Sequence, residues 1–197
     1  MKFRNILRAV FRPFFLLFWG LKAEGLENIP SEGPFIIAGN HIHFDDPIMH
    51  GMAVRREFHI MAKAELMKNP VIGFLLRSLG AFAVVRGTAD ISALDRAGEV
   101  LKNGSGLLIF PEGTRSRTGK LGKLKNGTAY IAGKNGAPVI PAARIKRRRL
   151  LFFPAVTIRY GKPIRPDEIS GDIMTPAGRR EFTEVLTKEI EKLIDKE

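Results

Sequence analysis

The sequence predicts an α/β fold: a single domain in which a mixed, largely parallel sheet is flanked by helices. Short apolar runs alternate along the chain with longer amphipathic segments, and turn residues separate them. Such alternation is typical of strand–helix–strand units, which place helices on the faces of a sheet. The chain has 197 residues, enough for one domain with a sizeable core, and it contains no repeat or linker that would separate a second domain.

Strands are predicted where a short apolar run lies between turn residues. The first run, Phe35-Ile36-Ile37-Ala38, follows a turn at residues 31–34 and ends at Gly39-Asn40. Further strands are expected at residues 58–61, 81–85, 107–110, 139–143 and 155–160. The strands at residues 35–38 and 107–110 both run into loops that are rich in polar side chains.

Helices are predicted from capping residues and from apolar positions spaced three or four residues apart. Asp46 is expected at an N-cap, with Pro47 at the first helical position. Further helices are expected at residues 70–79, 90–102, 128–134 and 176–196. Asn103-Gly104 would end the second of these.

The N-terminal segment, residues 1–22, is predicted to be a helix separate from a domain at residues 23–197. Three arginines recur every four residues along one helical stripe, and aromatic side chains cover much of the remaining surface. An amphipathic helix that lies in the membrane interface is the preferred interpretation. The residues expected to contact the membrane are Arg4, Arg8, Arg12, Phe14, Phe15, Phe18 and Trp19.

The apolar run of this segment, residues 13–21, is shorter than the ~20 residues needed to span a bilayer. A signal peptide and an ordinary packed helix are the other interpretations, although no small-residue cleavage site precedes Glu24. An interfacial helix predicts a peripheral or monotopic protein on the cytoplasmic face of the cell membrane.

The charge of the chain indicates an anionic partner. Lysine and arginine number 32 against 20 aspartate and glutamate residues, which gives a formal net charge of +12. The densest basic run, Arg144 and residues 146–149, precedes an apolar run at residues 150–153. It could contact anionic lipid headgroups or the acidic surface of a partner protein, bind nucleic acid, or form a solubilising loop. The absence of cysteine excludes disulfides and thiol catalysis and is consistent with a reducing compartment.

The most informative residues are His41 and Asp46, in the loop after the first predicted strand. An imidazole can accept a proton near neutral pH, and Asp46 is close enough in sequence to hydrogen-bond the other ring nitrogen. Asp46 could alternatively act only as a helix cap. The loop at residues 110–116 follows another predicted strand, so both loops could share one cleft at the carboxyl edge of the sheet.

Four motifs resemble, in order, those of the glycerolipid acyltransferase family, typified by 1-acylglycerol-3-phosphate acyltransferase. They are Asn-His-x-Ser-x-x-Asp, Gly-x-x-Phe-x-x-Arg, Phe-Pro-Glu-Gly-Thr-Arg-Ser and a proline-rich strand, matched here by residues 40–46, 80–86, 110–116 and 137–141. The resemblance spans residues 24–165. This chain departs from the family pattern at His43, where Ser is usual, and at Ala83, where Phe is usual.

The resemblance implies an enzyme of phospholipid biosynthesis. It would move a fatty acyl group from acyl-CoA or acyl carrier protein to the free hydroxyl of lysophosphatidate and produce phosphatidate. His41 would be the general base and Asp46 would hold its tautomer. The expected substrate-binding residues are Arg86, Glu112, Gly113, Thr114 and Arg115, with the two arginines on the phosphate. No metal or redox cofactor is expected beyond the thioester co-substrate.

Other interpretations of the motif remain open. His41-x-His43-x-Asp45-Asp46 also resembles the His-x-His-x-Asp-His signature of binuclear zinc hydrolases. Such a site needs further ligands, and the only other histidines are His50 and His59. A related acyltransferase with another lysolipid or glycerol phosphate acceptor, or a non-catalytic lipid or nucleic-acid binding protein, is also possible; no nucleic-acid partner is expected.

Overall fold

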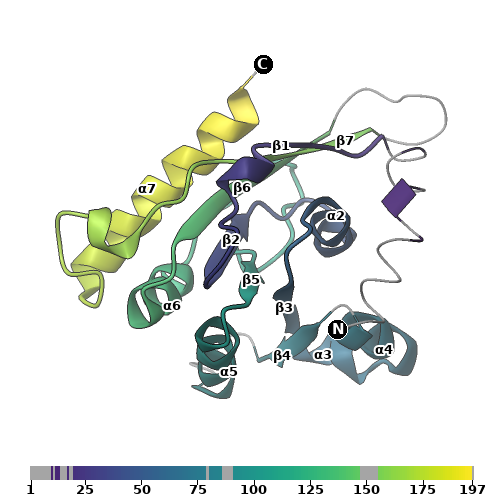
Figure 1. The fold of residues 1–197 in the computed structure, drawn as a ribbon, viewed down its shortest axis with the longest axis horizontal. Coiled ribbons are helices and arrows are strands. Elements are labelled where there is room, and N and C mark those ends of the chain that lie inside the picture. The colour runs from purple at the N-terminus through teal and green to yellow at the C-terminus, as the bar shows by residue number, and fades with distance from the viewer. Residues whose placement is uncertain are drawn as a thin grey trace.

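The computed structural model describes residues 10, 12–13, 17, 20–78, 80–85, 91–146 and 155–196. Within these residues, seven strands form one sheet at the centre of the structure (Figure 1). The strands are β1 (Lys22–Glu24), β2 (Phe35–Gly39), β3 (Phe58–Lys63), β4 (Ala81–Val84), β5 (Gly106–Ile109), β6 (Val139–Lys146) and β7 (Val156–Tyr160).

The sheet has the strand order β1-β7-β6-β2-β5-β3-β4. Neighbouring strands are parallel, except for β6 and β7, which are antiparallel. The prediction of a mixed, largely parallel sheet is therefore confirmed. The central strand β2 lies between β5 and β6, so the loops that follow these strands leave the same edge of the sheet.

Helices cover both faces of the sheet (Figure 1). They are α2 (Asp46–Ala53), α3 (Ala64–Lys68), α4 (Pro70–Ser78), α5 (Ile91–Lys102), α6 (Gly127–Asn135) and α7 (Pro176–Asp195). Two short 3-10 helices, η1 (Leu26–Asn28) and η2 (Pro166–Glu168), lie in connections. Helix α2 packs on one face of the sheet, whereas α5, α6 and α7 pack on the other.

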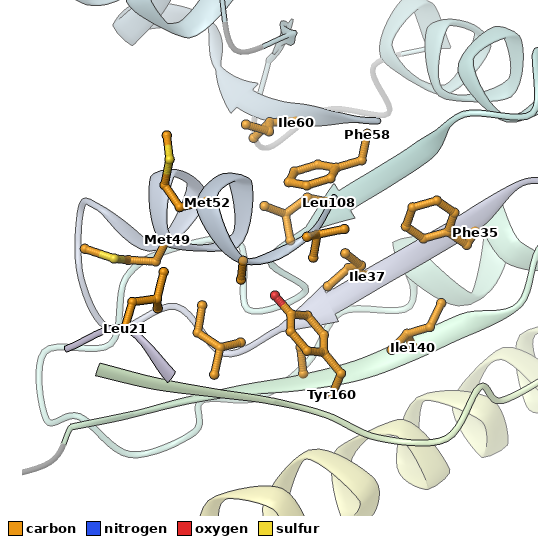
Figure 2. Close-up of a cluster of buried hydrophobic side chains, with 14 of the residues drawn as sticks. Leu21, Phe35, Ile37, Met49, Met52, Phe58, Ile60, Leu108, Ile140 and Tyr160 are labelled. Atoms are coloured by element: carbon orange, nitrogen blue, oxygen red, sulfur yellow. The ribbon is translucent and has the colours of Figure 1, made fainter. Parts of the chain in front are cut away.

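The sheet separates two hydrophobic cores, and β2 contributes to both. Phe35 and Ile37 point into the core beneath α2, while Ile36 and Ala38 point into the core beneath α5, α6 and α7. Because successive side chains of a strand alternate between faces, a strand buried on both faces is a continuous apolar run. Figure 2 shows the first core, in which Tyr160 of β7 lies among aliphatic side chains.

The structure corrects several predicted boundaries. Helix α2 begins at Asp46 with Asp45 at the N-cap, one residue before the predicted start. The β6 strand continues to Lys146, beyond the predicted end at residue 143. The short elements β1 and α3 were not predicted, because β1 contains two charged residues among three and α3 has only five residues.

Only part of the predicted interfacial segment is described, and its residues 10, 12–13 and 17 are helical. Val10 and Leu17 are exposed, but Arg12 Nε donates a hydrogen bond of 3.2 Å to the carbonyl oxygen of Met52. This arginine, predicted to contact lipid, therefore contacts the end of α2. The other predicted membrane contacts, Arg4, Arg8, Phe14, Phe15, Phe18 and Trp19, lie outside the described residues. Among the helices described, none is long and apolar enough to cross a membrane.

Candidate active site

His41 lies in the loop that leaves the carboxyl end of β2. Its Nδ1 is 2.7 Å from Oδ2 of Asp46, as the sequence predicts. Because a carboxylate only accepts, Nδ1 provides the hydrogen of this contact and Nε2 is left as the basic nitrogen. The imidazole also stacks on Phe110, with 4.2 Å between ring centroids and 19° between ring planes. The ring is thus held both at its edge and on its face.

Asp46 is fully buried and hydrogen-bonded on both carboxylate oxygens. Oδ2 also accepts hydrogen bonds of 2.9 Å from the backbone N–H groups of Ile42 and His43. Oδ1 accepts a hydrogen bond of 2.5 Å from Nη1 of Arg144. Burial acts to raise the pKa of Asp46, but the hydrogen bonds from His41, His43 and Arg144 outweigh it and hold the pKa below its usual value. The carboxylate is therefore ionised at neutral pH.

Arg144 is the principal site residue that the sequence analysis did not identify. It was placed in a basic surface run, yet its side chain is 3% exposed and binds both Asp45 and Asp46. The reason is that β6 continues past its predicted end, so residue 144 still belongs to the sheet. Within the described part of the chain, the buried Nε of Arg144 has no hydrogen-bond partner.

Asn40 fixes the start of the His41 loop to β6. Its side-chain Nδ2 donates to the carbonyl oxygen of Arg144 at 3.2 Å, and the backbone N–H of Arg144 donates to Asn40 Oδ1 at 2.7 Å. The buried amide side chain thus replaces a peptide group and extends the pairing of β2 with β6 beyond the Gly39–Ala142 register pair. Because both bonds are buried, the loss of either would leave a polar group unsatisfied.

Glu112 fixes the backbone of His41 from the other side. Its Oε1 accepts from the backbone N–H of His41 at 2.7 Å, and its Oε2 accepts from the backbone N–H of Gly122 at 2.8 Å. The backbone N–H of Ser116 donates to the carbonyl oxygen of His41 at 2.7 Å. Glu112 was predicted to bind substrate. In the structure its carboxylate is buried and accepts from the backbone of the His41 loop.

Gly113 adopts a left-handed backbone conformation, with φ of 74°. A Cβ atom at this position would lie 3.0 Å from Nζ of Lys125. Gly113 was predicted among the substrate-binding residues. The structure shows that the turn itself requires glycine.

A cationic cleft lies beside the His41 loop and has a volume of about 680 Å³. Its lining residues are Ile42, His43, Phe44, Lys63, Thr114, Arg115, Ser116 and Arg117. Thr114 and Arg115 were predicted here, whereas Lys63 and Arg117 were not. Arg86, the other predicted phosphate ligand, lies outside the described residues. Lys63 ends β3, and Arg117 follows the loop after β5, so their convergence depends on the topology of the sheet.

A second, apolar cavity of about 260 Å³ lies against Phe110. Its walls include Met61, Val84, Leu94, Ile109, Phe110 and Ile131. Because the imidazole of His41 stacks on the same phenyl ring, the proposed base lies close to this cavity.

His50 is a second buried imidazole that sequence analysis did not assign. Its Nδ1 is 3.0 Å from the hydroxyl oxygen of Tyr160, and the residue is 1% exposed. Burial lowers the pKa of His50 to about 4, although the negative charge of Asp46 opposes this effect. His50 is therefore neutral at physiological pH.

The two histidines of the zinc-like motif pair with different carboxylates. His41 binds Asp46, and His43 Nδ1 is 2.6 Å from Oδ1 of Asp45. In the part of the chain that the structure describes, no group of three or more His, Cys, Asp or Glu side chains is arranged to hold a metal ion.

The fold and site define a class of α/β proteins that present a histidine–aspartate pair at the carboxyl edge of a parallel sheet. Within that class, the chain belongs to the Acyltransferase family, whose sequence profile matches residues 20–144. The resemblance predicted from the four motifs is therefore confirmed.

Relatives of known name support this assignment. A 1-acyl-sn-glycerol-3-phosphate acyltransferase of Bacillus subtilis is 38% identical over 125 residues, 63% of this chain and 62% of that protein. The chloroplastic LPAT1 of Arabidopsis thaliana, which has the same activity in its name, is 35% identical over 127 residues, and the match covers 63% of this chain but 35% of the plant protein.

The crystal structure of the 1-acyl-sn-glycerophosphate (LPA) acyltransferase PlsC from Thermotoga maritima has a similar fold. Its TM-score is 0.72 at 30% sequence identity, and the match covers 96% of this chain and 80% of that protein. The α/β fold is therefore shared over nearly the whole chain.

Proposed function

We propose that this protein is an O-acyltransferase that esterifies the free hydroxyl of lysophosphatidate with an acyl group from a thioester donor. The main support is the contact of 2.7 Å between the imidazole of His41 and the ionised carboxylate of Asp46, beside a cationic cleft. The relatives described above have the same reaction in their names. The product would be phosphatidate, a precursor in phospholipid biosynthesis.

The reaction requires a base that is neutral before attack. Nε2 of His41 takes the proton of the acceptor hydroxyl while the hydroxyl oxygen attacks the thioester carbonyl carbon. The tetrahedral intermediate then expels the thiolate, which receives the proton back from the imidazolium. Asp46 accepts from Nδ1–H throughout and stabilises the imidazolium by its negative charge. No covalent bond to the enzyme forms.

The cationic cleft is the proposed site of the acceptor phosphate. Arg115 can make two charge-assisted hydrogen bonds to a phosphate group, and Lys63 and Arg117 add positive charge in the same cleft. Arg86 remains a predicted phosphate ligand from the sequence motif. A phosphate in this cleft would lie beside the loop of His41, as a glycerol hydroxyl near the base requires.

The apolar cavity against Phe110 is the proposed site for part of the acyl chain. Its lining residues are mostly aliphatic, and burial of apolar surface contributes about 25 cal/mol per Å². The donor would be acyl-CoA or acyl-acyl carrier protein, and no metal or redox cofactor participates in the proposed steps.

The N-terminal segment is proposed to hold the protein on the cytoplasmic face of the cell membrane. Its aromatic residues and arginines support this proposal. Deletion of residues 1–20 should abolish sedimentation with anionic phospholipid vesicles and activity on long-chain acceptors in bilayers. Turnover of a short-chain, water-soluble acceptor should persist. Undiminished vesicle binding by the truncated chain would place the anchor elsewhere.

The decisive assay measures thiol release from acyl-CoA in the presence and absence of lysophosphatidate. Acceptor-dependent thiol release, with phosphatidate identified by mass spectrometry, is the expected result. Monoacylglycerol, which lacks the phosphate, should be a poor acceptor. Parallel reactions with acyl-acyl carrier protein identify the donor. Binding of lysophosphatidate without any thiol release from either donor would instead indicate a non-catalytic lipid-binding protein.

A further inference from the structure

His43 is a second carboxylate-paired imidazole, and it lines the cleft. Its side chain is 42% exposed, whereas that of Asp45 is 11% exposed. Because Nδ1 of His43 is hydrogen-bonded to Asp45, Nε2 is the ring nitrogen left for a ligand in the cleft. The serine usual in the family motif would present a short neutral hydroxyl at this position.

The charges behind His43 and His41 belong to one cluster. Nη1 of Arg144 binds both Asp45 and Asp46, so two carboxylates share a single buried guanidinium group. These three side chains have a combined charge of −1 when both carboxylates are ionised. One further positive charge would neutralise the cluster, and an imidazole borders each carboxylate.

The position of that positive charge decides whether the site can react. A proton on His41 would block its action as a base, whereas a proton on His43 would leave Nε2 of His41 free to accept one. Two imidazoliums beside one cluster would also repel each other, which favours a single positive charge on one of the two rings. His43 is the more exposed of the two rings, and it faces the cleft in which an anion would bind.

We propose that His43 determines acceptor specificity. Held by Asp45 as an imidazolium, it donates a charge-assisted hydrogen bond from Nε2–H to the acceptor phosphate while His41 stays neutral as the base. This inference rests on the proposed function, because its ligand is a glycerol phosphate monoester. His43 acts by binding the acceptor and takes no part in proton transfer at the reacting hydroxyl.

The charged groups around His43 come from several elements of the fold. They are Asp45 and Asp46 at the start of α2, Arg144 in β6, Lys63 at the end of β3, Arg115 and Arg117 in the loop after β5, and His41 and Glu112 behind the cleft. Lys63, Arg115 and Arg117 add positive charge to the same cleft, so the contribution of His43 is measured against that background.

The test compares the Michaelis constant for lysophosphatidate in the wild-type enzyme, His43→Ser and His43→Lys at one pH, near pH 6. The ratio of a variant's constant to that of the wild type cancels the ionisation of the phosphate itself. For His43→Ser this ratio should be about tenfold, because the charge-assisted hydrogen bond to the phosphate is lost. The kcat and the donor KM should change by less than about twofold, since His43 contacts only the acceptor.

His43→Lys keeps a positive charge beside Asp45 and should restore acceptor affinity. Lys134→Ser is the matched control for the removal of a cation. Lys134 lies in the last turn of α6, away from the cleft residues, so its substitution should leave the acceptor KM unchanged.

An acceptor KM for His43→Ser within about twofold of the wild-type value would overturn the inference. So would a His43→Lys enzyme as weak as His43→Ser, or equal losses for donor and acceptor. Calorimetric binding of glycerol 3-phosphate near pH 6 tests His43 separately from turnover. If the wild type releases no thiol, the proposed function fails, and weaker glycerol 3-phosphate binding by His43→Ser than by wild type and His43→Lys would still support the phosphate contact.

Discussion

His41 and His50 lie against the same phenyl ring and have opposite properties. The ring of Phe110 is 4.2 Å from the centroid of His41 in a stacked geometry, and 6.2 Å from that of His50 in an edge geometry. His41 Nδ1 meets the carboxylate of Asp46, whereas His50 Nδ1 meets the hydroxyl of Tyr160. One imidazole pairs with a carboxylate beside the cleft, and the other is a neutral part of the core.

The difference shows that the partner of Nδ1 and the burial of the ring determine what an imidazole can do. A carboxylate stabilises the imidazolium that forms during proton transfer, and a phenol does not. Complete burial lowers the pKa of His50 to about 4, so its ring does not take up a proton near neutral pH. The following predictions test this contrast, starting with the largest effect.

Replacement of the base should have the largest effect. His41→Ala should lower kcat by about 10²–10⁴-fold with little change in the acceptor KM, because general base catalysis acts in the transition state. Asp46→Asn should follow the same pattern with a smaller loss. Thiol-release kinetics on folded variants provide the measurement, and near wild-type turnover by His41→Ala would falsify the mechanism.

Removal of the shared cation should destabilise the whole site. Arg144→Met leaves two adjacent buried carboxylates uncompensated, which should lower the free energy of unfolding by about 3–5 kcal/mol. Urea denaturation of the two proteins measures the loss. Arg159→Met is a comparison in which the arginine removed pairs with the half-exposed Glu24, and its loss should be smaller. An Arg144→Met protein as stable as wild type would mean that the carboxylates are protonated.

His50 should make the free energy of unfolding depend on pH between about pH 4 and 6.5, a range in which Asp46 does not change its charge. Its pKa is about 4 in the folded protein and about 6.5 when unfolded, so between these values the unfolded chain binds more protons. The stability contribution is complete above about pH 6.5 and is lost as the pH falls toward 4, by up to about 3 kcal/mol. Unfolding of His50→Phe should lack this slope relative to wild type. Equal slopes in both proteins would show that His50 is accessible to protons.

Asp46 affects the free energy of unfolding at a lower pH than His50 does. Its pKa is lowered from 3.8, so its contribution to stability is present above that value and is lost only as the pH falls through the lower folded value. Measurements between about pH 4 and 6.5 therefore report the buried imidazole separately from the catalytic carboxylate.

The smallest effect is expected at Glu112. Glu112→Gln keeps one acceptor oxygen, so either His41 or Gly122 loses the partner of its backbone N–H, at a cost of about 1–3 kcal/mol in stability. The kcat should fall more than acceptor binding weakens, because the loop of the base moves. Glu184→Gln, on the exposed side of α7, is the control and should match wild type in both measurements.

The features that could be predicted from the sequence are those that depend on a local pattern of residues. Strands such as β2 and β5 are buried on both faces, so their apolar runs were identified correctly. The contact between His41 and Asp46 was predicted because the residues are close in sequence. Arg144 was not predicted as a site residue, because it is 98 residues away from Asp46, the carboxylate that it binds. It also begins the basic run, so the last residues of β6 did not look like a strand in the sequence.

Glu112 shows a second limit of prediction from sequence. A carboxylate in a loop motif that resembles a family signature suggests a substrate contact, but its function depends on the direction in which the side chain points. The fold directs one oxygen of Glu112 to the backbone N–H of His41 in another loop, and the other oxygen to the backbone N–H of Gly122 in its own loop. Sequence spacing does not contain that information, because His41 is 71 residues away.

The double hydrogen bond between Asn40 and Arg144 also makes formation of the site depend on the pairing of β6 with β2. The two residues are 104 positions apart, so they meet only after β6 has paired with β2. A nascent chain that ends before residue 144 already contains both histidines and both aspartates of the site. It lacks the guanidinium group that allows the two carboxylates to lie side by side. The reactive geometry therefore requires that β6 has joined the central sheet.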